Sequence, residues 1–435
     1  MADAVREMIT STLLSYRNMT ERGTEQPHIC LYIGSLQKGG AERVMANLAE
    51  YLYSQGWKVT FVTTYFRPPE YAPPHRLWDE QTGEPYDERL GTASGDPKDP
   101  VQGDGIRRIY SDPPQEQLSK GRIRGFCARY HVLRTIWKKE KPDIILSFIG
   151  YNNSFAVLTS RGLHIPVAVS VRSNPAYEYD SRKLRTMAFA LFRQADGVVL
   201  QTHESASFFP QAIRRRSVIL PNAVNPDFLR PRYEGEREKK VVCVGRLDDN
   251  KNQGLLIEQF ARAHRRHPEY TLHLYGDGPC REKFEEFARQ IGVEDSVVFE
   301  GTVDNIPERI EKASIFVLSS KTEGMPNALL EAMSLGLACI ATDCPCGGPR
   351  ELIRSGENGF LVPITYVGRL EREKEAIPPP YDRRVPTMAE RLIQLMDDPE
   401  LADRLGRAAA RVQEEYSPEK VGSRWRDYLL GLMKD

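Results

Sequence analysis

The stretch HICLYIGSLQKGGAER, residues 28–43, decides the fold of the first half of the chain. His28–Gly34 is a short apolar run, rich in β-branched and aromatic residues, which is typical of a buried strand. Ala41–Ser54 has the pattern of a helix, and Lys58–Thr64 has the pattern of a second strand. Strand, helix and strand in this order predict a crossover connection, and hence a parallel sheet that is covered on both faces.

The same alternation continues along the chain, and a second series of strands and helices begins at Lys240–Gly245. A chain of 435 residues is too long for one ordinary core. We therefore expect an α/β fold with two doubly wound, Rossmann-like domains that face each other across a cleft. Further strands are predicted at Asp143–Ile149, Pro166–Val171, Gly197–Gln201, Thr271–Tyr275, Val297–Phe299, Ile315–Leu318 and Ala338–Ala341.

The domain boundaries follow from changes in composition. We expect an N-terminal domain over 28–220, after an extension at 1–27, and a C-terminal domain over 239–415. The Pro-rich, charged segment 221–238 is typical of a linker, and a final helix over 416–435 is expected to pack back on the N-terminal domain. Two polar segments interrupt the pattern, 67–105, with a hairpin predicted near Trp78, and 366–386.

The composition excludes several classes of protein. Sixty basic and 60 acidic residues give no net charge, which argues against a nucleic-acid binder driven by bulk charge. Seven scattered cysteines suggest reduced thiols, and Cys344 and Cys346 lack a second ligand pair for zinc, so we expect no metal. Acidic residues near the N-terminus and the lack of a long apolar run predict a cytoplasmic protein with neither signal peptide nor membrane span.

Two loops between a strand and a helix carry the features of an anion site. Gly39 and Gly40 allow backbone amides to approach an anion at a helix N-terminus, although glycines in such a turn also serve packing alone. In the second domain, Arg246 and Lys251 follow the first strand. Two cations there would neutralise a departing diphosphate, and the alternative is a solvated turn with charged caps.

The segment from Ser319 to Gly336 carries the most specific pattern. Glu323 and Glu331 are separated by seven residues, and Pro326 between them favours a helix start. Glu323 then lies in the loop and Glu331 in the helix, and the amides of the first helical residues point at a phosphate. One carboxylate is placed to accept from sugar hydroxyls and the other from ribose hydroxyls; a solvent-facing role is the alternative for Glu331.

With these residues the chain resembles the retaining glycosyltransferases of family 4, which have the GT-B fold, over most of its length. The resemblance rests on Glu323–Glu331, the E-x7-E signature, supported by Arg246, Lys251 and the G-G-A-E-R run that ends at Arg43. It implies that Arg246 and Lys251 contact the diphosphate, Glu331 the ribose and Glu323 the transferred sugar, with no cofactor beyond the sugar-nucleotide donor. The other implied donor-binding residues are Gly39, Gly40, Thr302 and Val303 beside the base, Gly324, Met325, Pro326, Asn327, Ala328 and Leu329.

One departure from the family concerns a histidine that many relatives carry near the sugar. The equivalent segment here, Val171–Pro175, has none. Arg172, Ser173 and Asn174, together with Arg43, are the residues expected near the sugar and the acceptor. The resemblance then implies that the departing phosphate oxygen itself takes the acceptor's proton, on the same face of the sugar.

The segment Lys120–Lys141 suggests where the acceptor comes from. It contains eight Lys or Arg residues interleaved with apolar ones, the pattern of a basic amphipathic helix. Such a helix lies against an anionic membrane or meets a lipid diphosphate, and the alternative is an ordinary surface helix with a buried stripe. Relatives with the same motifs extend lipid-linked or surface polysaccharides, so a polyprenyl-diphosphate saccharide is the expected acceptor.

We therefore predict metal-independent, retaining transfer of a hexose or N-acetylhexosamine, from a UDP-sugar, to a saccharide acceptor. The rival hypotheses are a sugar-nucleotide epimerase or hydrolase of the same architecture, and a catalytically silent scaffold. Rapid donor consumption without acceptor would favour the first rival, and absence of UDP binding the second.

Overall fold

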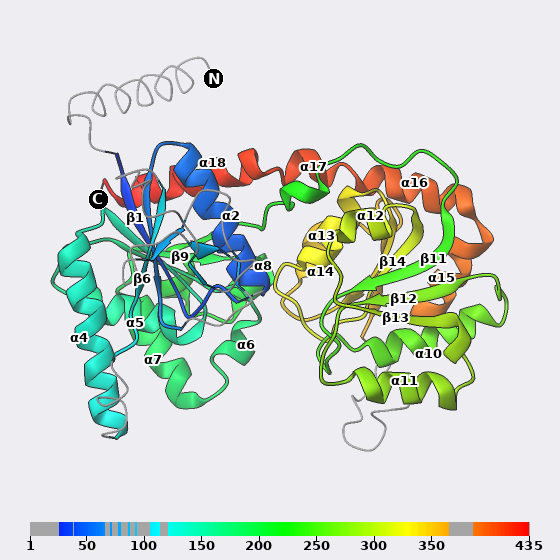
Figure 1. The fold of residues 1–435 in the computed structure, drawn as a ribbon, viewed down its shortest axis with the longest axis horizontal. Coiled ribbons are helices and arrows are strands. Elements are labelled where there is room, and N and C mark those ends of the chain that lie inside the picture. Colours follow the sequence, from blue (N-terminus) through cyan, green and yellow to red (C-terminus); the bar gives the residue numbers. More distant parts are fainter. Residues whose placement is uncertain are drawn as a thin grey trace, which may run out of the picture.

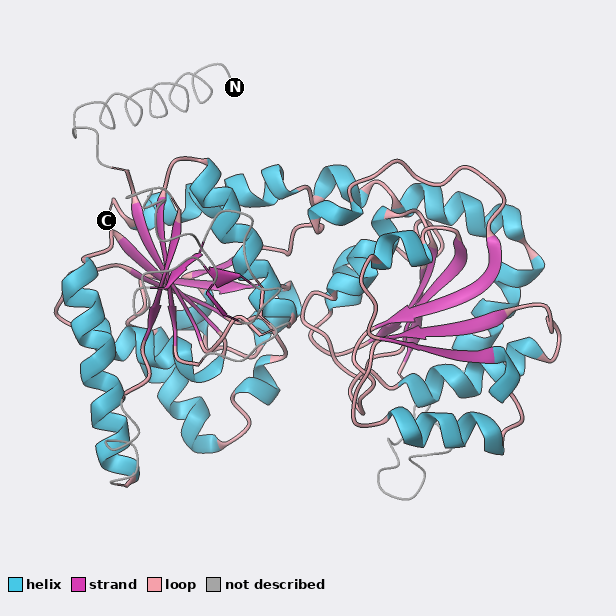
Figure 2. Cartoon of the chain, viewed as in Figure 1, coloured by secondary structure: helices cyan, strands magenta, loops and turns pink. Residues whose placement is uncertain are grey.

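The computed structural model describes residues 26–37, 39–65, 70–71, 77–79, 86–87, 92–93, 105–113, 121–364 and 386–434. These residues form two domains side by side (Figure 1). Each domain is a sheet with helices on both faces, as Figure 2 shows. The expected α/β architecture is confirmed. Nearly all of the predicted extension 1–27 and insertion 366–386 lies outside the described residues.

The N-terminal domain is built on an eight-stranded sheet in the order β10-β9-β8-β7-β1-β2-β6-β3. Each pair of neighbouring strands in it is parallel. The strands are β1 (His28–Ile33), β2 (Lys58–Thr63), β3 (Leu77–Asp79), β6 (Ile106–Tyr110), β7 (Ile144–Phe148), β8 (Val167–Ser170), β9 (Gly197–Leu200) and β10 (Ser217–Ile219). The helices are α2 (Gly40–Ser54), α4 (Arg122–Glu140), α5 (Gly150–Ser160), α6 (Pro175–Glu178), α7 (Arg182–Phe192), α8 (His203–Ser207) and α9 (Gln211–Arg214).

The segment between β2 and β6 differs from the expected loop with a hairpin near Trp78. Trp78 belongs to β3, which pairs in parallel with β6 at the edge of the main sheet. The antiparallel pair lies further along the chain, between β4 (Tyr86–Asp87) and β5 (Thr92–Ala93). A hairpin does lie in this segment, but further along the chain than predicted, because a three-residue strand has no periodicity that a sequence can reveal.

The C-terminal domain is built on a six-stranded parallel sheet in the order β13-β12-β11-β14-β15-β16. Its strands are β11 (Glu238–Val244), β12 (Thr271–Tyr275), β13 (Val297–Gly301), β14 (Ala313–Leu318), β15 (Ala338–Asp343) and β16 (Phe360–Pro363). Its helices are α10 (Gln253–His264), α11 (Arg281–Gln290), α12 (Ile306–Ile310), α13 (Asn327–Ser334), α14 (Gly348–Leu352), α15 (Met388–Asp397), α16 (Pro399–Ala409) and α17 (Val412–Glu415), with 3-10 turns at Pro226–Phe228 and Glu294–Ser296.

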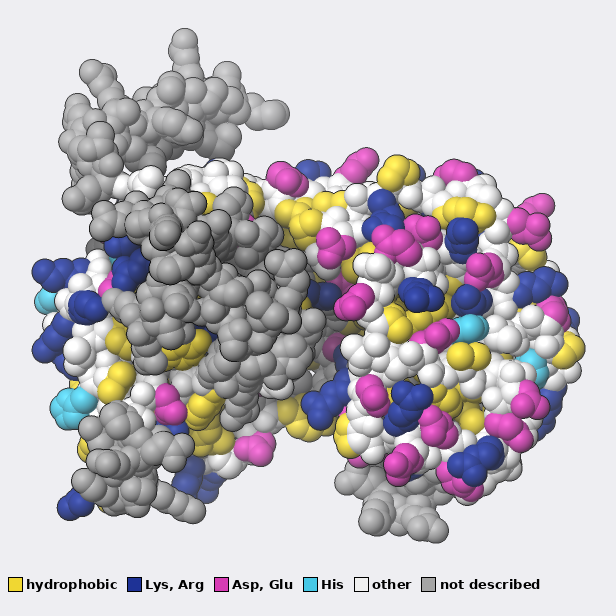
Figure 3. All heavy atoms as spheres, viewed as in Figure 1, with side chains coloured by type: hydrophobic (Ala, Val, Ile, Leu, Met, Phe, Trp, Pro, Cys, Tyr) yellow, Lys and Arg dark blue, Asp and Glu magenta, His cyan; other side chains and the backbone are white. Residues whose placement is uncertain are grey.

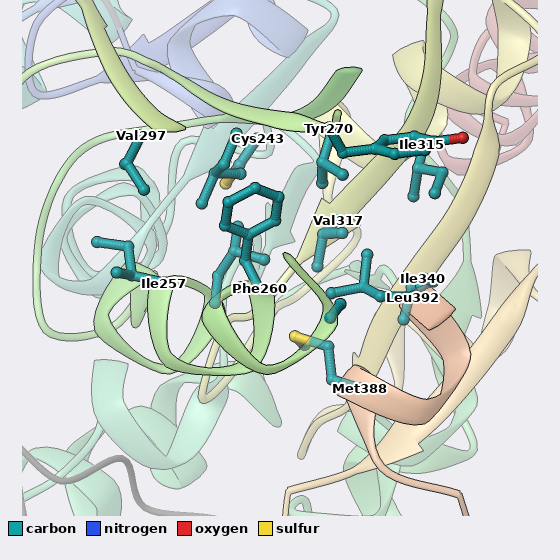
Figure 4. Packing of buried hydrophobic residues seen from close by; sticks show 14 of the residues in the cluster. Cys243, Ile257, Phe260, Tyr270, Val297, Ile315, Val317, Ile340, Met388 and Leu392 are labelled. Atoms are coloured by element: carbon teal, nitrogen blue, oxygen red, sulfur yellow. The ribbon is translucent and has the colours of Figure 1, made fainter. Parts of the chain in front are cut away.

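Apolar side chains fill both faces of each sheet, as a doubly wound fold requires. Figure 4 shows one face of the C-terminal core, where Phe260 of α10 points toward Cys243 of β11 and Ile257 lies on the side of Val297. Met388 and Leu392 of α15 close the same core. The outer surface of this domain carries charges of both signs intermixed (Figure 3).

The last helix, α18 (Pro418–Leu432), returns to the N-terminal domain (Figure 1). Its Val421, Trp425 and Leu429 are buried in the core formed by β1, β2 and α2. The chain thus crosses between the domains twice. The two crossings touch, because the Val224 N–H donates to the Tyr416 carbonyl at 2.8 Å.

Candidate active site

A cavity of about 920 Å³ lies between the two domains. Parallel strands point their carboxyl ends at this space, where open α/β sheets bind ligands. The volume falls within the range of small-molecule sites. Its walls combine Gly39, Gly40, Arg43, Tyr71, Ile149, Arg172, Ser173, Asn174, Tyr177, Glu178, Gln201 and Asn222 with Gly245, Arg246, Asp248, Lys251, Lys321, Thr322, Glu323, Gly324, Met325, Asn327, Ala328 and Glu331, among others.

Lys251 and Glu323 form an ion pair in this cavity. The Lys251 Nζ lies 2.6 Å from the Glu323 Oε1, which also accepts a hydrogen bond of 2.6 Å from the Ser320 hydroxyl. Burial on its own lowers the pKa of Lys251, but the adjacent Glu323 carboxylate outweighs it and raises the pKa. Lys251 therefore stays charged, and Glu323 is held by two partners in a fixed position.

Helix α13 begins at Asn327, with Pro326 at its N-cap. The Leu330 N–H donates to the Pro326 carbonyl at 3.1 Å, so the amides of the three helical residues before it have no carbonyl of the same helix to bond. Both Asn327 and Ala328 line the cavity. The helix start therefore offers N–H donors and the positive end of its dipole to an anion.

Glu331 lies one turn further along α13 and is paired across the cleft with Arg43 of α2. Glu331 is almost completely buried, at 5% exposure. Burial raises the pKa of Glu331 to about 6, and the Arg43 guanidinium opposes this rise. The pair joins the two domains directly, and it places a carboxylate acceptor deep in the cavity.

Arg246 also lines the cavity, and it is accessible to solvent. Its side chain is 70% exposed, and its Nε lies 3.9 Å from the Asp248 carboxylate. At this separation and exposure the contact with Asp248 is weak. The guanidinium is thus placed to bind an incoming anion.

The N-terminal wall is formed by the loop after β8. Asn174 donates to the Thr322 hydroxyl at 2.9 Å, across the cleft. Arg172 is buried, and its guanidinium donates to Asn222 and packs over the Phe148 ring at 5.1 Å. Burial lowers the pKa of Arg172 to about 9. Arg172 therefore supports the wall from inside rather than presenting its charge to the cavity.

Two family models match the chain, and together they cover both domains. The model for glycosyltransferase family 4 matches residues 38–228, and the model for glycosyl transferases group 1 matches residues 238–376. The chain is a family 4 glycosyltransferase with the GT-B fold.

Similar proteins include two bacterial glycosyltransferases. One is the amylovoran biosynthesis glycosyltransferase of Erwinia amylovora, 22% identical over 408 residues, 92% of this chain and 99% of the relative. The other is an α-1,4-N-acetyl-D-galactosaminyltransferase of Campylobacter jejuni, whose name specifies an undecaprenol-diphosphate-linked saccharide. It is 27% identical over 237 residues, 54% of this chain and 64% of the relative.

A solved structure of Anabaena HepE in complex with UDP has a similar fold. The TM-score is 0.69 with 16% sequence identity, and the match covers 93% of this chain and all of the other. At this level of identity the likeness establishes the fold of the glycosyltransferase alone.

Not every residue predicted from the sequence reaches the cavity of this glycosyltransferase. Thr302 and Val303, expected beside the base, follow β13 and are absent from the described lining, as are Pro326 and Leu329. Leu329 is fully buried in the core below α13, so only its backbone N–H is available to the site.

Four polar or strained residues of the N-terminal wall were not predicted from the sequence. Gln201 follows β9, Asn222 is the second residue of the linker, and Glu178 accepts hydrogen bonds from Ser173 and from the Gly150 amide at 3.0 Å. Ile149 has a φ of 71°, a strained value for a β-branched residue, of a kind that clusters at functional sites. No motif connects these residues, because each follows a different strand.

A second cavity, of about 820 Å³, lies within the N-terminal domain of the glycosyltransferase. Ile149 lines both cavities, so the two are neighbours. Its walls are largely aromatic and aliphatic, with one arginine, Arg129, from α4. Its other lining residues are Tyr32, Gly34, Thr64, Tyr65, Ser111, Gly121, Gly125, Phe126, Leu133, Tyr151, Asn152 and Phe155.

Proposed function

We propose that this glycosyltransferase transfers a hexose or N-acetylhexosamine from a UDP-sugar to a saccharide acceptor, with retention of anomeric configuration. The observation that carries the proposal is the cluster of Lys251, Glu323, the α13 amides and Glu331 in one cavity. A nucleoside diphosphate sugar presents the complementary groups in the same order, namely sugar hydroxyls, diphosphate and ribose hydroxyls. The similar HepE structure is a complex with UDP, which supports the choice of nucleotide.

Electrostatic stabilisation of the leaving group is the main catalytic effect in this proposal. Lys251, Arg246 and the N-terminal amides of α13 surround the site of the diphosphate, where negative charge grows as the glycosidic bond breaks. Positive groups of the protein thus do what a bound metal does in other transferases. Activity that persists in excess EDTA is the expected result, and loss restored by a divalent cation would contradict this part.

Retention follows if the acceptor attacks from the side of the departing phosphate. The acceptor hydroxyl then bonds to the anomeric carbon as the bond to the phosphate oxygen breaks, and its proton passes to that oxygen. Glu323 would hold the sugar hydroxyls while this occurs. One-dimensional NMR of the product formed from an α-linked donor tests the idea, because an α-linked product supports retention and a β-linked product overturns it.

The second cavity supports an acceptor that carries an apolar part. It opens beside the donor cavity at Ile149 and is bounded by α4, whose Ile123 and Phe126 are 81% and 46% exposed. These two side chains lie three residues apart and so share one face of the helix. The saccharide specified in the name of the Campylobacter jejuni relative is lipid-linked. We therefore favour a polyprenyl-diphosphate saccharide that reaches the site along α4.

Contact with an anionic membrane through 120–141 belongs to the same proposal. The inner stripe of α4 is buried, including Leu133 and Trp137, while Ile123, Arg124, Lys138 and Lys139 are exposed. None of the described helices is long and apolar enough to cross a bilayer. Sedimentation with vesicles should show binding to phosphatidylglycerol and not to phosphatidylcholine, and Ile123→Ser should weaken it; equal binding to both lipids would contradict an electrostatic contact.

The decisive experiment offers a panel of sugar nucleotides to the purified protein with polyprenyl-diphosphate saccharides from a membrane extract. Formation of an extended glycolipid from one UDP-sugar is the expected result. Donor consumption at the same rate without acceptor would favour a hydrolase or epimerase. A protein that binds no sugar nucleotide would be a silent scaffold.

A further inference from the structure

The loop from Glu323 to Asn327 in the C-terminal domain, here called the donor loop, is held by two amide side chains that lie outside that domain. Gln201, which follows β9, accepts a hydrogen bond from the Met325 N–H at 3.2 Å. Asn222, the second residue of the linker, donates from its Nδ2 to the Met325 carbonyl at 3.1 Å. Both backbone polar groups of one loop residue are thus bound across the cleft.

The side chain of Asn222 is 2% exposed, and each of its polar atoms is used. Its Oδ1 accepts from the Arg172 guanidinium and from the Gln201 Nε2 at 3.0 Å. Because a guanidinium only donates, the oxygen of Asn222 must face Arg172 and the nitrogen must face the donor loop. The amide therefore has one acceptor end toward the N-terminal domain and one donor end toward the C-terminal domain.

Asn327 accepts the second hydrogen bond that the Asn222 Nδ2 donates. The Asn222 Nδ2 lies 2.6 Å from the Asn327 Oδ1, and the Asn327 Nδ2 in turn lies 3.4 Å from the Gly40 carbonyl. Asn327 is the first residue of α13, and Gly40 is the first of α2. The starts of two helices are thereby connected through side-chain amides to the linker.

The packing leaves the donor loop little freedom in this arrangement. A Cβ added to Gly324 would clash with the Gln201 Oε1 and would lie 3.0 Å from the Arg172 carbonyl. The loop between Glu323 and Asn327 is thus in van der Waals contact with the N-terminal domain. A change in the angle between the domains must move the hydrogen bonds of Asn222 as well.

We propose that Asn222 is a positioning residue, which sets the start of α13 and the donor loop for the diphosphate when the domains close. The inference rests on the proposed function, since it assigns the diphosphate to α13. Asn222 touches no reacting atom in this account and acts through Met325 and Asn327. Placing such a residue in the linker makes assembly of the donor site depend on closure, which excludes water before transfer begins.

The substitution Asn222→Asp tests the proposal with an isosteric side chain. The carboxylate keeps an acceptor for Arg172 and Gln201, but its second oxygen faces the Met325 carbonyl and the Asn327 Oδ1. Removing donors from two buried acceptors misplaces the loop, so calorimetry should show UDP binding weakened by about 10-fold or more. Circular dichroism should show the secondary structure of the unsubstituted protein, with a lower melting temperature because two buried acceptors have lost their donors.

The control is Asn225→Asp, the same change of charge in the same linker. The Asn225 side chain donates to the Asp227 carboxylate at 3.4 Å and does not line the cavity in the described part of the chain. UDP affinity should be unchanged. Should Asn222→Asp fail to fold, Gln201→Met, which removes the acceptor for the Met325 N–H, should still weaken UDP binding.

A double-mutant cycle separates positioning from a general structural effect. Asn222→Asp and Asn327→Ala remove the same hydrogen bond. The double variant should therefore lose less UDP affinity than the product of the two single losses. Independent losses, or wild-type affinity in Asn222→Asp, would overturn the inference. If the unsubstituted protein itself binds no UDP, the proposed function fails instead.

Discussion

The two walls of the donor cavity are made in different ways. The C-terminal wall comes from one continuous run, Glu323–Glu331, and a single turn that carries Arg246 and Lys251. The N-terminal wall is collected from the ends of separate strands, and much of it consists of amide side chains and backbone. The C-terminal wall, with Arg246, Lys251 and the two glutamates, suits recognition of the donor, and the N-terminal wall suits its placement. Four substitutions test this division: three are in the C-terminal wall, and one is in the neighbouring apolar cavity of the N-terminal domain.

The largest effect is expected for Glu323→Gln. The amide keeps the shape of the side chain but loses its negative charge. The ion pair with Lys251 is then lost, and one of the two oxygens that can accept from Ser320 and the sugar hydroxyls is replaced by a donor. Because these contacts act on the reacting sugar, turnover should fall by about 100- to 1000-fold. Initial-rate kinetics with UDP-sugar and acceptor measure the change, with circular dichroism to verify the fold. Unchanged turnover would remove Glu323 from the site.

Arg246→Ala should act on donor binding more than on turnover. Loss of a charge-assisted contact costs about 1.5–3 kcal/mol, so UDP affinity should fall by about 10- to 100-fold. Calorimetric titration with UDP measures it. Arg266→Ala, another exposed arginine that pairs with Asp397, is the matched control and should bind UDP normally. Equal affinity in both variants would show that the C-terminal wall does not use Arg246 to bind the donor.

The contribution of Glu331, in the C-terminal wall, to the free energy of unfolding is expected to depend on pH. Its pKa is raised from 4.5 to about 6 in the folded chain, so the folded state holds a proton that the unfolded state has lost between these values. The contribution of Glu331 to the free energy of unfolding is therefore complete below pH 4.5 and declines as the pH rises through about 6. The shift corresponds to at most about 2 kcal/mol.

Urea unfolding of the protein and of Glu331→Gln, at several values between pH 4.5 and 7, measures this decline. The difference in stability between the two should change in favour of Glu331→Gln as the pH rises. A difference that does not vary with pH would show that Arg43 holds the carboxylate at an ordinary pKa.

The smallest effect is expected on the N-terminal side, for Phe126→Ala. Phe126 packs edge-to-face against Phe155, with ring centroids 5.2 Å apart, in the apolar cavity. Losing about 1 kcal/mol of apolar contact should raise the KM for a lipid-linked acceptor about 5-fold, with the donor KM unchanged. Val298→Ala, at an exposed apolar position of the other domain, serves as control. A change in donor KM alone would assign the second cavity to the donor.

The same division explains what the sequence could predict. The alternation of apolar strands and helices indicated both sheets, and the family model that matches 238–376 covers the run with its two glutamates. Side chains such as Gln201 and Asn222 could not be predicted, because only the parallel sheet brings the ends of distant strands together. Nor could the burial of Arg172 be predicted, since it depends on Trp425 from the last helix, whose ring lies 5.7 Å from the guanidinium.

The return of α18 to the first domain has a mechanical consequence. A single connection would let the two domains rotate in any direction. Here two connections are joined by the hydrogen bond between Val224 and Tyr416, which leaves bending about one axis as the easiest motion. Trp425 is buried in the N-terminal domain and holds the second connection there. Cutting the chain before Pro418 would consequently do more than shorten a tail: it would open the interior of the N-terminal domain to water and free the C-terminal domain to twist.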